Sequence, residues 1–166
     1  MTIQVGDTLP SITLKYSLPN KHDENACAIP QTLNTTEFFK GKKAVIFAVP
    51  GAFTPTCSSN HLPSFIEHYS DLKEKGVDII ACLATNVMYA WGKDQGVGDQ
   101  ILMLSDGNGE FCDALGLTQD LTKAVMGAKR AQRFALLVDD LRVAYVGVET
   151  GPGVGPSGPE AVLSHL

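Results

Sequence analysis

The sequence lacks the features that would place it in a membrane, outside the cell or on a nucleic acid. No run approaches the roughly 20 apolar residues that a membrane-spanning helix needs, and no charged start leads into an apolar stretch as in a signal peptide. Four cysteines among 166 residues are too few for a disulfide-rich secreted domain. A net charge of −5 argues against a phosphate backbone as the main partner. We therefore expect a soluble, intracellular protein with no membrane or nucleic-acid partner.

Several motifs for catalysis and cofactor binding are also missing. No cysteine has another cysteine three residues further on, which excludes a thioredoxin-type C-x-x-C reductase. Neither the phosphate loop G-x-x-x-x-G-K nor G-x-G-x-x-G after a strand occurs. Cys57 and His61 share a helix face, but the other histidines are scattered, so the four ligands of a structural zinc site are not available. We expect no metal and no bound cofactor.

What the chain does have is the length and composition of one globular domain, residues 1–166, with 44% hydrophobic and 19% charged residues. Short apolar runs at 44–49 and 77–83 predict buried strands. Apolar positions three and four residues apart predict a helix over 58–75, ended by Gly76. Further strands are expected at 101–104, 134–138 and 143–148, helices at 88–94, 109–115 and 159–163, and an edge strand at 12–16. This alternation predicts an α/β fold, a mixed central sheet with helices on both faces.

The segment Pro50-Gly51-Ala52-Phe53-Thr54-Pro55-Thr56-Cys57 carries the strongest local signal. It places Cys57 at the N-terminus of the predicted helix, where free N–H groups and the helix dipole favour a thiolate. The Thr54 hydroxyl, three residues earlier, can turn toward the sulfur, and the prolines hold the loop in one shape. The arrangement suits a nucleophilic sulfur activated by its surroundings. The alternative interpretation is a buried, inert cysteine.

These residues resemble a known family. Pro50-x-x-x-Thr54-x-x-Cys57 matches the active-site motif of the peroxiredoxins, and the longer run with His61-Leu62-Pro63 resembles their type-5 (atypical, or type II) subfamily. The resemblance continues along nearly the whole chain, through Lys75-Gly76-Val77-Asp78, Ala90-Trp91-Gly92, Leu104-Ser105-Asp106 and Arg133-Phe134-Ala135-Leu136.

The resemblance implies a thioredoxin-like fold with N-terminal additions, a homodimer, and thiol-dependent reduction of hydrogen peroxide and organic hydroperoxides. By position, Cys57 is the peroxidatic cysteine and Thr54 is the hydroxyl that orients the peroxide. Arg133 matches the arginine that steadies the thiolate and the developing charge, and Pro50 shields the sulfur. A fixed guanidinium suits that task because it is charged at any cellular pH.

Two neighbours of this set receive lesser roles. His61 is expected to be a packed, hydrogen-bonded helix residue that supports the loop around Cys57. Arg130 lies three residues before Arg133 and could replace it, but we interpret it mainly as a surface charge.

The resemblance also suggests how the oxidised sulfur is resolved. Animal type-5 members use a cysteine in the C-terminal loop, but residues 151–159 contain none. Cys27, in the context Cys27-Ala28-Ile29-Pro30, resembles the resolving cysteine of fungal members, which bonds across two subunits and is recycled by thioredoxin. Cys82 lies in an apolar strand and is expected to be buried and inert. We predict no role for Cys112.

Other interpretations stay open. Within the same class, a one-Cys enzyme recycled by glutathione or glutaredoxin would leave Cys27 idle. A redox sensor that passes its oxidation to a partner protein would use the same thiolate. The terminal Ser164-His165-Leu166 resembles the peroxisomal address Ser-Lys-Leu, so we expect a peroxisomal or a cytoplasmic protein.

Overall fold

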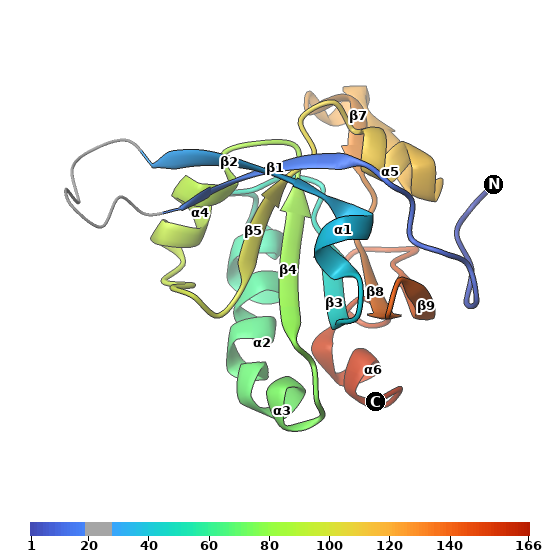
Figure 1. Cartoon of the computed structure of the whole chain (residues 1–166). Helices are drawn as coiled ribbons and strands as arrows, with labels where there is room; N and C mark the ends of the chain where they lie inside the picture. The colour runs from blue at the N-terminus through green and yellow to red at the C-terminus, as the bar shows by residue number, and fades with distance from the viewer. Residues whose placement is uncertain (19–27) are drawn as a thin grey trace.

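A seven-stranded mixed sheet forms the centre of the molecule in a computed structural model that describes residues 1–18 and 28–166. Its strand order is β2-β1-β5-β4-β3-β8-β9 (Figure 1), and β3, β4 and β5 run parallel to one another. The strands are β1 (Thr13–Leu18), β2 (Ile29–Asn34), β3 (Lys43–Ala48), β4 (Ile79–Ala84), β5 (Leu102–Ser105), β8 (Phe134–Asp139) and β9 (Arg142–Val148). A separate hairpin pairs β6 (Thr118–Leu121) with β7 (Gly127–Ala131).

Helices pack on both faces of the sheet. One face is covered by α1 (Thr35–Phe39) and α5 (Glu110–Leu115). The other is covered by α2 (Leu62–Glu67), α3 (Tyr69–Glu74), α4 (Met88–Asp94) and α6 (Pro159–Leu163). The predicted α/β fold with a mixed sheet is therefore confirmed, and its layout is thioredoxin-like. Within the described residues no helix is both long and apolar enough to cross a membrane.

Strand β3 shows why the central strands read as continuous apolar runs. Its alternate residues bury into opposite layers: Ile46 belongs to one apolar cluster and Phe47 to the other. A strand covered on both faces has no side that faces water, so alternation of polar and apolar residues disappears. The same holds for β4, where Cys82 and Leu83 lie in different clusters.

The helix predicted over 58–75 is not continuous. After one α-helical step at Pro55 and Thr56 it widens into a π-turn, Cys57–His61, in which the Leu62 N–H donates to the Cys57 carbonyl oxygen. It then breaks at His68 between α2 and α3. Pro63 explains the wide first turn, because proline has no N–H to give to residue 59 and its ring crowds that carbonyl. Gly76 ends the helical segment with φ +84°, as predicted.

Some elements were not predicted. The strand β2, the short helix α1 and the β6–β7 hairpin have mostly exposed or half-buried residues, so they carry weak hydrophobic periodicity. Helix α1 begins at the Asn34 cap, whose side-chain oxygen accepts from the Thr36 and Glu37 N–H groups. Strands β8 and β9 are joined by a hairpin turn at Asp140 and Leu141, which both have positive φ.

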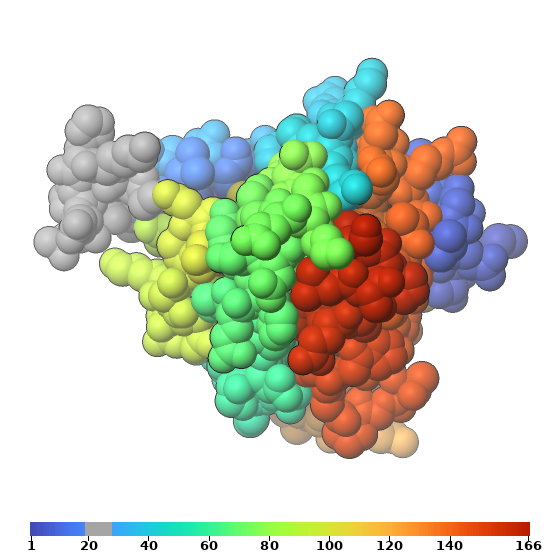
Figure 2. Space-filling model, turned by 90° about the horizontal axis from the view of Figure 1, so that it is seen from below, coloured from blue at the N-terminus to red at the C-terminus, as the bar shows by residue number. Residues whose placement is uncertain are grey.

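The segment 150–158, here called the cap loop, leaves β9 and returns across it before α6 begins. It passes so close to β9 that a Cβ on Gly147 would lie 2.0 Å from the Pro156 carbonyl oxygen. The same oxygen accepts a hydrogen bond from the Tyr145 hydroxyl, at 2.8 Å. Helix α6 then packs against α3, and Figure 2 shows the C-terminal segment lying against the segment that contains α3. The C-terminal end of the loop is therefore held against β9.

The contact at Gly147 yields a test of this packing. We expect Gly147→Ala to lower the free energy of unfolding by about 2 kcal/mol or more, because the methyl group must push the cap loop off β9. Urea denaturation measures the loss. Gly151→Ala is the matched control, since nothing lies within 4 Å of a Cβ there; equal stability of the two variants would contradict the close contact.

Candidate active site

Cys57 lies just beyond the C-terminal end of β3, where the loop 50–56 leads into the π-turn. Its side chain is fully buried in the apolar cluster that also holds Phe65 and Trp91. The first turn is anchored by Trp91, whose Nε1–H donates to Ser58 Oγ at 3.0 Å. The sulfur is therefore enclosed by protein.

Two side chains offer hydrogen bonds to the sulfur. Thr54 Oγ1 lies 2.9 Å from Cys57 Sγ and 2.8 Å from the Gly51 carbonyl oxygen, so its single proton serves one of them at a time. Arg133 Nη2 donates to Sγ at 3.3 Å. The Thr54 methyl group is packed against Gly51, where an added Cβ would come within 3.1 Å of it.

The sheet register explains how Arg133 reaches a residue 76 positions away in the sequence. Strand β8 pairs antiparallel with β3, and Phe134 is the partner of Ala48. Arg133, immediately before β8, therefore emerges at the same sheet edge from which the Cys57 loop departs. The predicted set of Cys57, Thr54 and Arg133 is thus brought together in space.

His61 lies beneath Arg133 and is fully buried. Its Nε2 lies 2.9 Å from the Ser157 carbonyl oxygen and its Nδ1 lies 3.0 Å from Arg133 Nη1. A carbonyl only accepts and a guanidinium only donates, so these partners assign the proton to Nε2 and leave Nδ1 as the acceptor. Burial lowers the pKa of His61 to about 4; the Ser157 carbonyl opposes this and the Arg133 charge adds to it. His61 is thus neutral at physiological pH.

Glu149 and Ser157 belong to this site and were not predicted. The backbone N–H of Glu149 donates to the Arg133 carbonyl oxygen at 2.9 Å. Its carboxylate oxygen Oε1 accepts from the Ser157 hydroxyl at 2.7 Å. Burial alone would raise the pKa of Glu149, but hydrogen bonds from Ser157 and Gly155 hold it below its usual value. A lone Glu beside a Gly/Pro-rich loop gives no sequence signal for such a contact.

Pro50 borders the approach to the site. It lines a pocket of about 460 Å³ together with Arg133. The rest of the wall is mostly uncharged, and is formed by Thr56, Gln119, Leu121, Gln132, Glu149, Thr150, Gly151, Pro152 and Gly153. Neither Cys57 nor Thr54 is among the residues that line this pocket.

The remaining thiols differ from Cys57 in their surroundings. Cys82 and Cys112 are free and buried. Burial raises the pKa of both thiols, with Asp106 adding to the effect at Cys112. Cys27, the predicted resolving residue, lies outside the described residues. Among residues 1–18 and 28–166, no three His, Cys, Asp or Glu side chains gather closely enough to hold a metal ion.

Arg130 is not the free surface charge that we predicted. It is half-buried, and its guanidinium donates to the Met126 carbonyl oxygen at 2.6 Å and to Thr85 Oγ1 at 2.8 Å. The first contact lies within the β6–β7 hairpin and the second ties the hairpin to the loop after β4, so Arg130 is engaged away from the sulfur.

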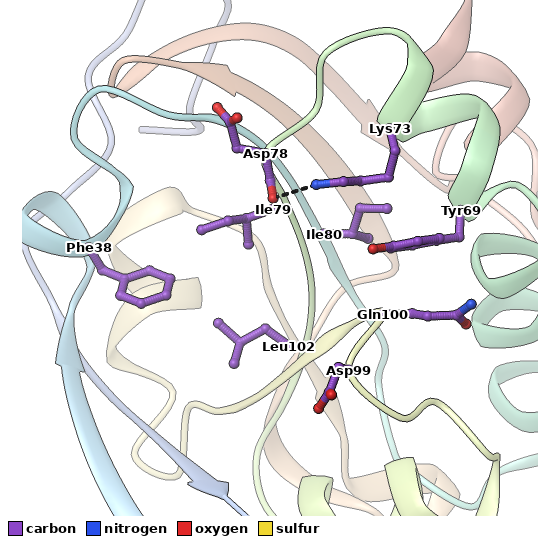
Figure 3. A pocket seen from close by; sticks show the side chains of 9 residues that line it. All are labelled: Phe38, Tyr69, Lys73, Asp78, Ile79, Ile80, Asp99, Gln100 and Leu102. Carbon is purple, nitrogen blue, oxygen red and sulfur yellow. Dashed lines mark hydrogen bonds between the residues drawn. The ribbon is translucent and has the colours of Figure 1, made fainter.

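A second pocket, of about 200 Å³, lies at the opposite end of the parallel strands, where β4 and β5 begin (Figure 3). Lys73 Nζ donates there to the Asp78 carbonyl oxygen at 2.9 Å. The wall of this second pocket is formed by Phe38, Tyr69, Lys73, Asp78, Ile79, Ile80, Asp99, Gln100 and Leu102, none of which surrounds Cys57.

The buried neutral state of His61 predicts how stability depends on pH. The unfolded chain protonates this histidine near pH 6.5, but the folded chain does so only near pH 4. Between these values the unfolded state binds more protons than the folded state. The contribution of neutral His61 to the free energy of unfolding is therefore complete above pH 6.5 and is lost as the pH falls toward 4. Between pH 7.5 and 4.5 we expect the free energy of unfolding to fall by roughly 2–3 kcal/mol less in His61→Gln than in the wild type.

Urea denaturation at the two pH values measures this difference. His68→Gln is the control, since His68 lies on the same helical segment without contacting the sulfur. If His61→Gln loses as much stability on acidification as the wild type, His61 is not held neutral by the fold.

The chain matches proteins of known family along most of its length. The family model described as Redoxin matches residues 4–163. Peroxiredoxin-2E of Arabidopsis thaliana, a chloroplastic protein, is 43% identical over 99% of this chain and 70% of its own length. The chloroplastic Peroxiredoxin-2E-2 of Oryza sativa is 47% identical over 99% of this chain and 73% of its own length.

A solved structure agrees with these relatives. Reduced Prx3 of Vibrio vulnificus, in complex with hydrogen peroxide, superposes with a TM-score of 0.87 at 42% identity and covers 98% of both chains. The family match and the identity over the whole chain lead to the same conclusion: this chain belongs to the Redoxin family and is a peroxiredoxin, an enzyme of the thiol peroxidase class.

Proposed function

We propose that Cys57 is the peroxidatic residue of this peroxidase and reduces hydrogen peroxide and organic hydroperoxides. The observation that carries the proposal is the buried Cys57 sulfur with donors from both Thr54 and Arg133. The thiolate attacks one peroxide oxygen, the O–O bond breaks, and the sulfur becomes a sulfenic acid. The other oxygen leaves with the electrons of the O–O bond and takes up one proton, equal to the one that the thiol released on ionising, so that water or an alcohol forms.

The donors around the sulfur match the charge movement of this step. Negative charge leaves the sulfur and grows on the departing oxygen, so a fixed guanidinium within reach of both lowers the barrier. Arg133 meets this requirement because His61 holds one of its nitrogens while the other faces the sulfur. The Thr54 hydroxyl can donate to the sulfur before the attack and to a peroxide oxygen during it. A related protein solved with hydrogen peroxide, Prx3 of Vibrio vulnificus, supports the substrate.

The burial of Cys57 constrains the resolution of the sulfenic acid. A fully buried sulfenic acid cannot meet another protein's thiol unless the π-turn Cys57–His61 opens. That turn is short and lacks a side-chain cap at its start, so opening it disrupts little regular helix. We propose that resolution requires such an opening.

Cys27 of the partner subunit is the proposed resolving thiol, and the enzyme is then a homodimer. Its sulfur attacks the Cys57 sulfenic acid, water leaves and a disulfide forms between subunits. A dithiol such as thioredoxin reduces that bond and is itself left as a disulfide. In the rival route, glutathione or glutaredoxin reduces the oxidised Cys57 and Cys27 takes no part. In a second alternative the protein is a redox sensor, which passes its oxidation to a partner protein. Cys82 and Cys112 are poor candidates because burial keeps them protonated.

The subfamily, the number of domains and the location of the protein are also proposals. We infer a type-5 (type II) peroxiredoxin from the run 50–57 and His61-Leu62-Pro63. We also infer that residues 1–166 form one domain. Relatives of this chain carry the name Peroxiredoxin-2, which favours a different subfamily. We propose the cytoplasm or the peroxisome as its location, from the terminal Ser164-His165-Leu166. His165 stacks on the Tyr145 ring at 4.1 Å, so a receptor must detach it to read the tripeptide.

Substitutions around the sulfur test the proposed chemistry. We expect Cys57→Ser to abolish peroxide consumption, and Thr54→Val and Arg133→Met each to lower the rate constant with hydrogen peroxide by about 10²–10³-fold, as when one preorganised donor is lost. Stopped-flow fluorescence can follow the reaction, because the single tryptophan, Trp91, contacts the turn that holds Cys57.

Arg142→Met is the matched control for Arg133→Met, because Arg142 is exposed and donates only to the Gly6 carbonyl oxygen among the described side-chain contacts. Wild-type rates in Arg133→Met, or equal losses in both arginine variants, would remove Arg133 from the mechanism.

Non-reducing gel electrophoresis after one equivalent of hydrogen peroxide tests the resolving thiol. We expect the wild type and Cys82→Ser to run as covalent dimers, and Cys27→Ser and Cys57→Ser as monomers. A wild type that stays monomeric while Cys57 consumes peroxide would exclude Cys27 and favour glutathione or glutaredoxin. Loss of the dimer in Cys82→Ser alone would assign resolution to Cys82.

A further inference from the structure

Hydrogen bonds around Arg133 form a closed circuit that begins and ends on this residue. Its carbonyl oxygen accepts from the Glu149 N–H at 2.9 Å. The Glu149 carboxylate binds Ser157, the Ser157 carbonyl oxygen binds His61, and His61 Nδ1 binds the Arg133 guanidinium. The backbone and the side chain of Arg133 are therefore tied to each other through the cap loop.

One atom, Glu149 Oε1, holds the loop in this circuit. It accepts from the Gly155 N–H at 2.7 Å, from the Ser157 N–H at 2.9 Å and from the Ser157 hydroxyl at 2.7 Å. Three donors that converge on one oxygen fix the orientation of the 155–157 backbone. The Ser157 carbonyl oxygen is thereby aimed at His61 Nε2.

The orientation of that carbonyl decides the tautomer of His61. While Nε2 donates to Ser157, Nδ1 has a lone pair for Arg133 Nη1. Without this acceptor the imidazole proton can move to Nδ1, which would then face the guanidinium with a proton and repel it. Arg133 would lose the contact that leaves its Nη2 aimed at Cys57 Sγ.

The carboxylate of Glu149 binds the cap loop rather than the sulfur, so its effect must pass through these intermediates. We propose that Glu149 is a positioning residue of this peroxidase: its carboxylate sets the Ser157 carbonyl, which fixes the His61 tautomer that aims Arg133 at Cys57. This inference rests on the proposed role of Cys57 and Arg133, and it assigns to the cap loop a part in the first chemical step.

The rate constant with hydrogen peroxide is the first measurement. We expect Glu149→Ala to lower it about tenfold or more, and Glu149→Gln to keep at least about a third of it, since the amide oxygen still accepts from the loop. Ser157→Ala removes one of the three bonds and should fall between these variants. Glu160→Ala, which removes an exposed carboxylate on α6, is the matched control and should match the wild type.

A double-mutant cycle and NMR distinguish positioning from simple destabilisation. In an Arg133→Lys background, which lacks the second guanidinium nitrogen, Glu149→Ala should change the rate constant less than about twofold. The side-chain ¹⁵N signals of His61 should show the Nε2–H tautomer in the wild type and a mixture of tautomers in Glu149→Ala. If that variant does not fold, Ser157→Ala carries both measurements.

Several results would overturn the proposal: a wild-type rate in Glu149→Ala, an undiminished loss in the Arg133→Lys background, an unchanged His61 tautomer, or a Glu149→Gln variant as slow as Glu149→Ala. The last result would mean that the charge of Glu149 acts directly. A wild type without Cys57-dependent peroxide consumption would instead refute the proposed function, and the ¹⁵N signals would still test the circuit.

Discussion

The contact of the Arg133 guanidinium with both His61 and Cys57 is the constraint on which the site depends. A guanidinium beside a buried sulfur loses much of its hydration, and in a medium of low polarizability its field acts strongly on nearby charge. That environment is tolerable only if the donors of the guanidinium find partners. The neutral His61 nitrogen supplies one, and the Cys57 sulfur supplies another. The cation, the imidazole and the thiol thus satisfy each other beside the apolar cluster that holds Cys57.

The sheet creates this contact by placing two distant segments at one edge. The antiparallel pairing of β3 with β8 sets Arg133 opposite the start of the Cys57 loop. The return of the chain along β9 then brings Glu149 beside Arg133. Ile46 and Phe47 of β3 pack in opposite apolar layers, so a slip of one residue would force each of them into the layer that the other now fills. The geometry of the site is therefore held by the register of the core.

The sequence predicted the elements with strong hydrophobic patterns, namely the central strands and the helices on both faces, because those patterns report burial directly. It could not predict the β6–β7 hairpin, whose residues are largely exposed, or the π-turn, which arises from Pro63 acting on residues before it. Cys57 and Thr54 were singled out by their position before the predicted helix, and Arg133 was found through the resemblance to the peroxiredoxins. Glu149 and Ser157 were missed because their role is a convergence of backbone groups in a loop, and side-chain spacing does not report it.

The Thr54 hydroxyl has a consequence beyond orienting a substrate. Its carbon framework is locked, since a β-branched side chain has few rotamers and its methyl group packs on Gly51. Only the hydroxyl hydrogen is free to rotate, between the Gly51 carbonyl oxygen and the sulfur. A protonated sulfur can donate to Oγ1 and leave that hydrogen on Gly51, whereas a thiolate draws the hydrogen to itself. The direction of the Thr54 hydroxyl hydrogen therefore depends on whether the sulfur is ionised. The hydrogen bonds of the loop before Cys57 change with that ionisation although none of its heavy atoms moves.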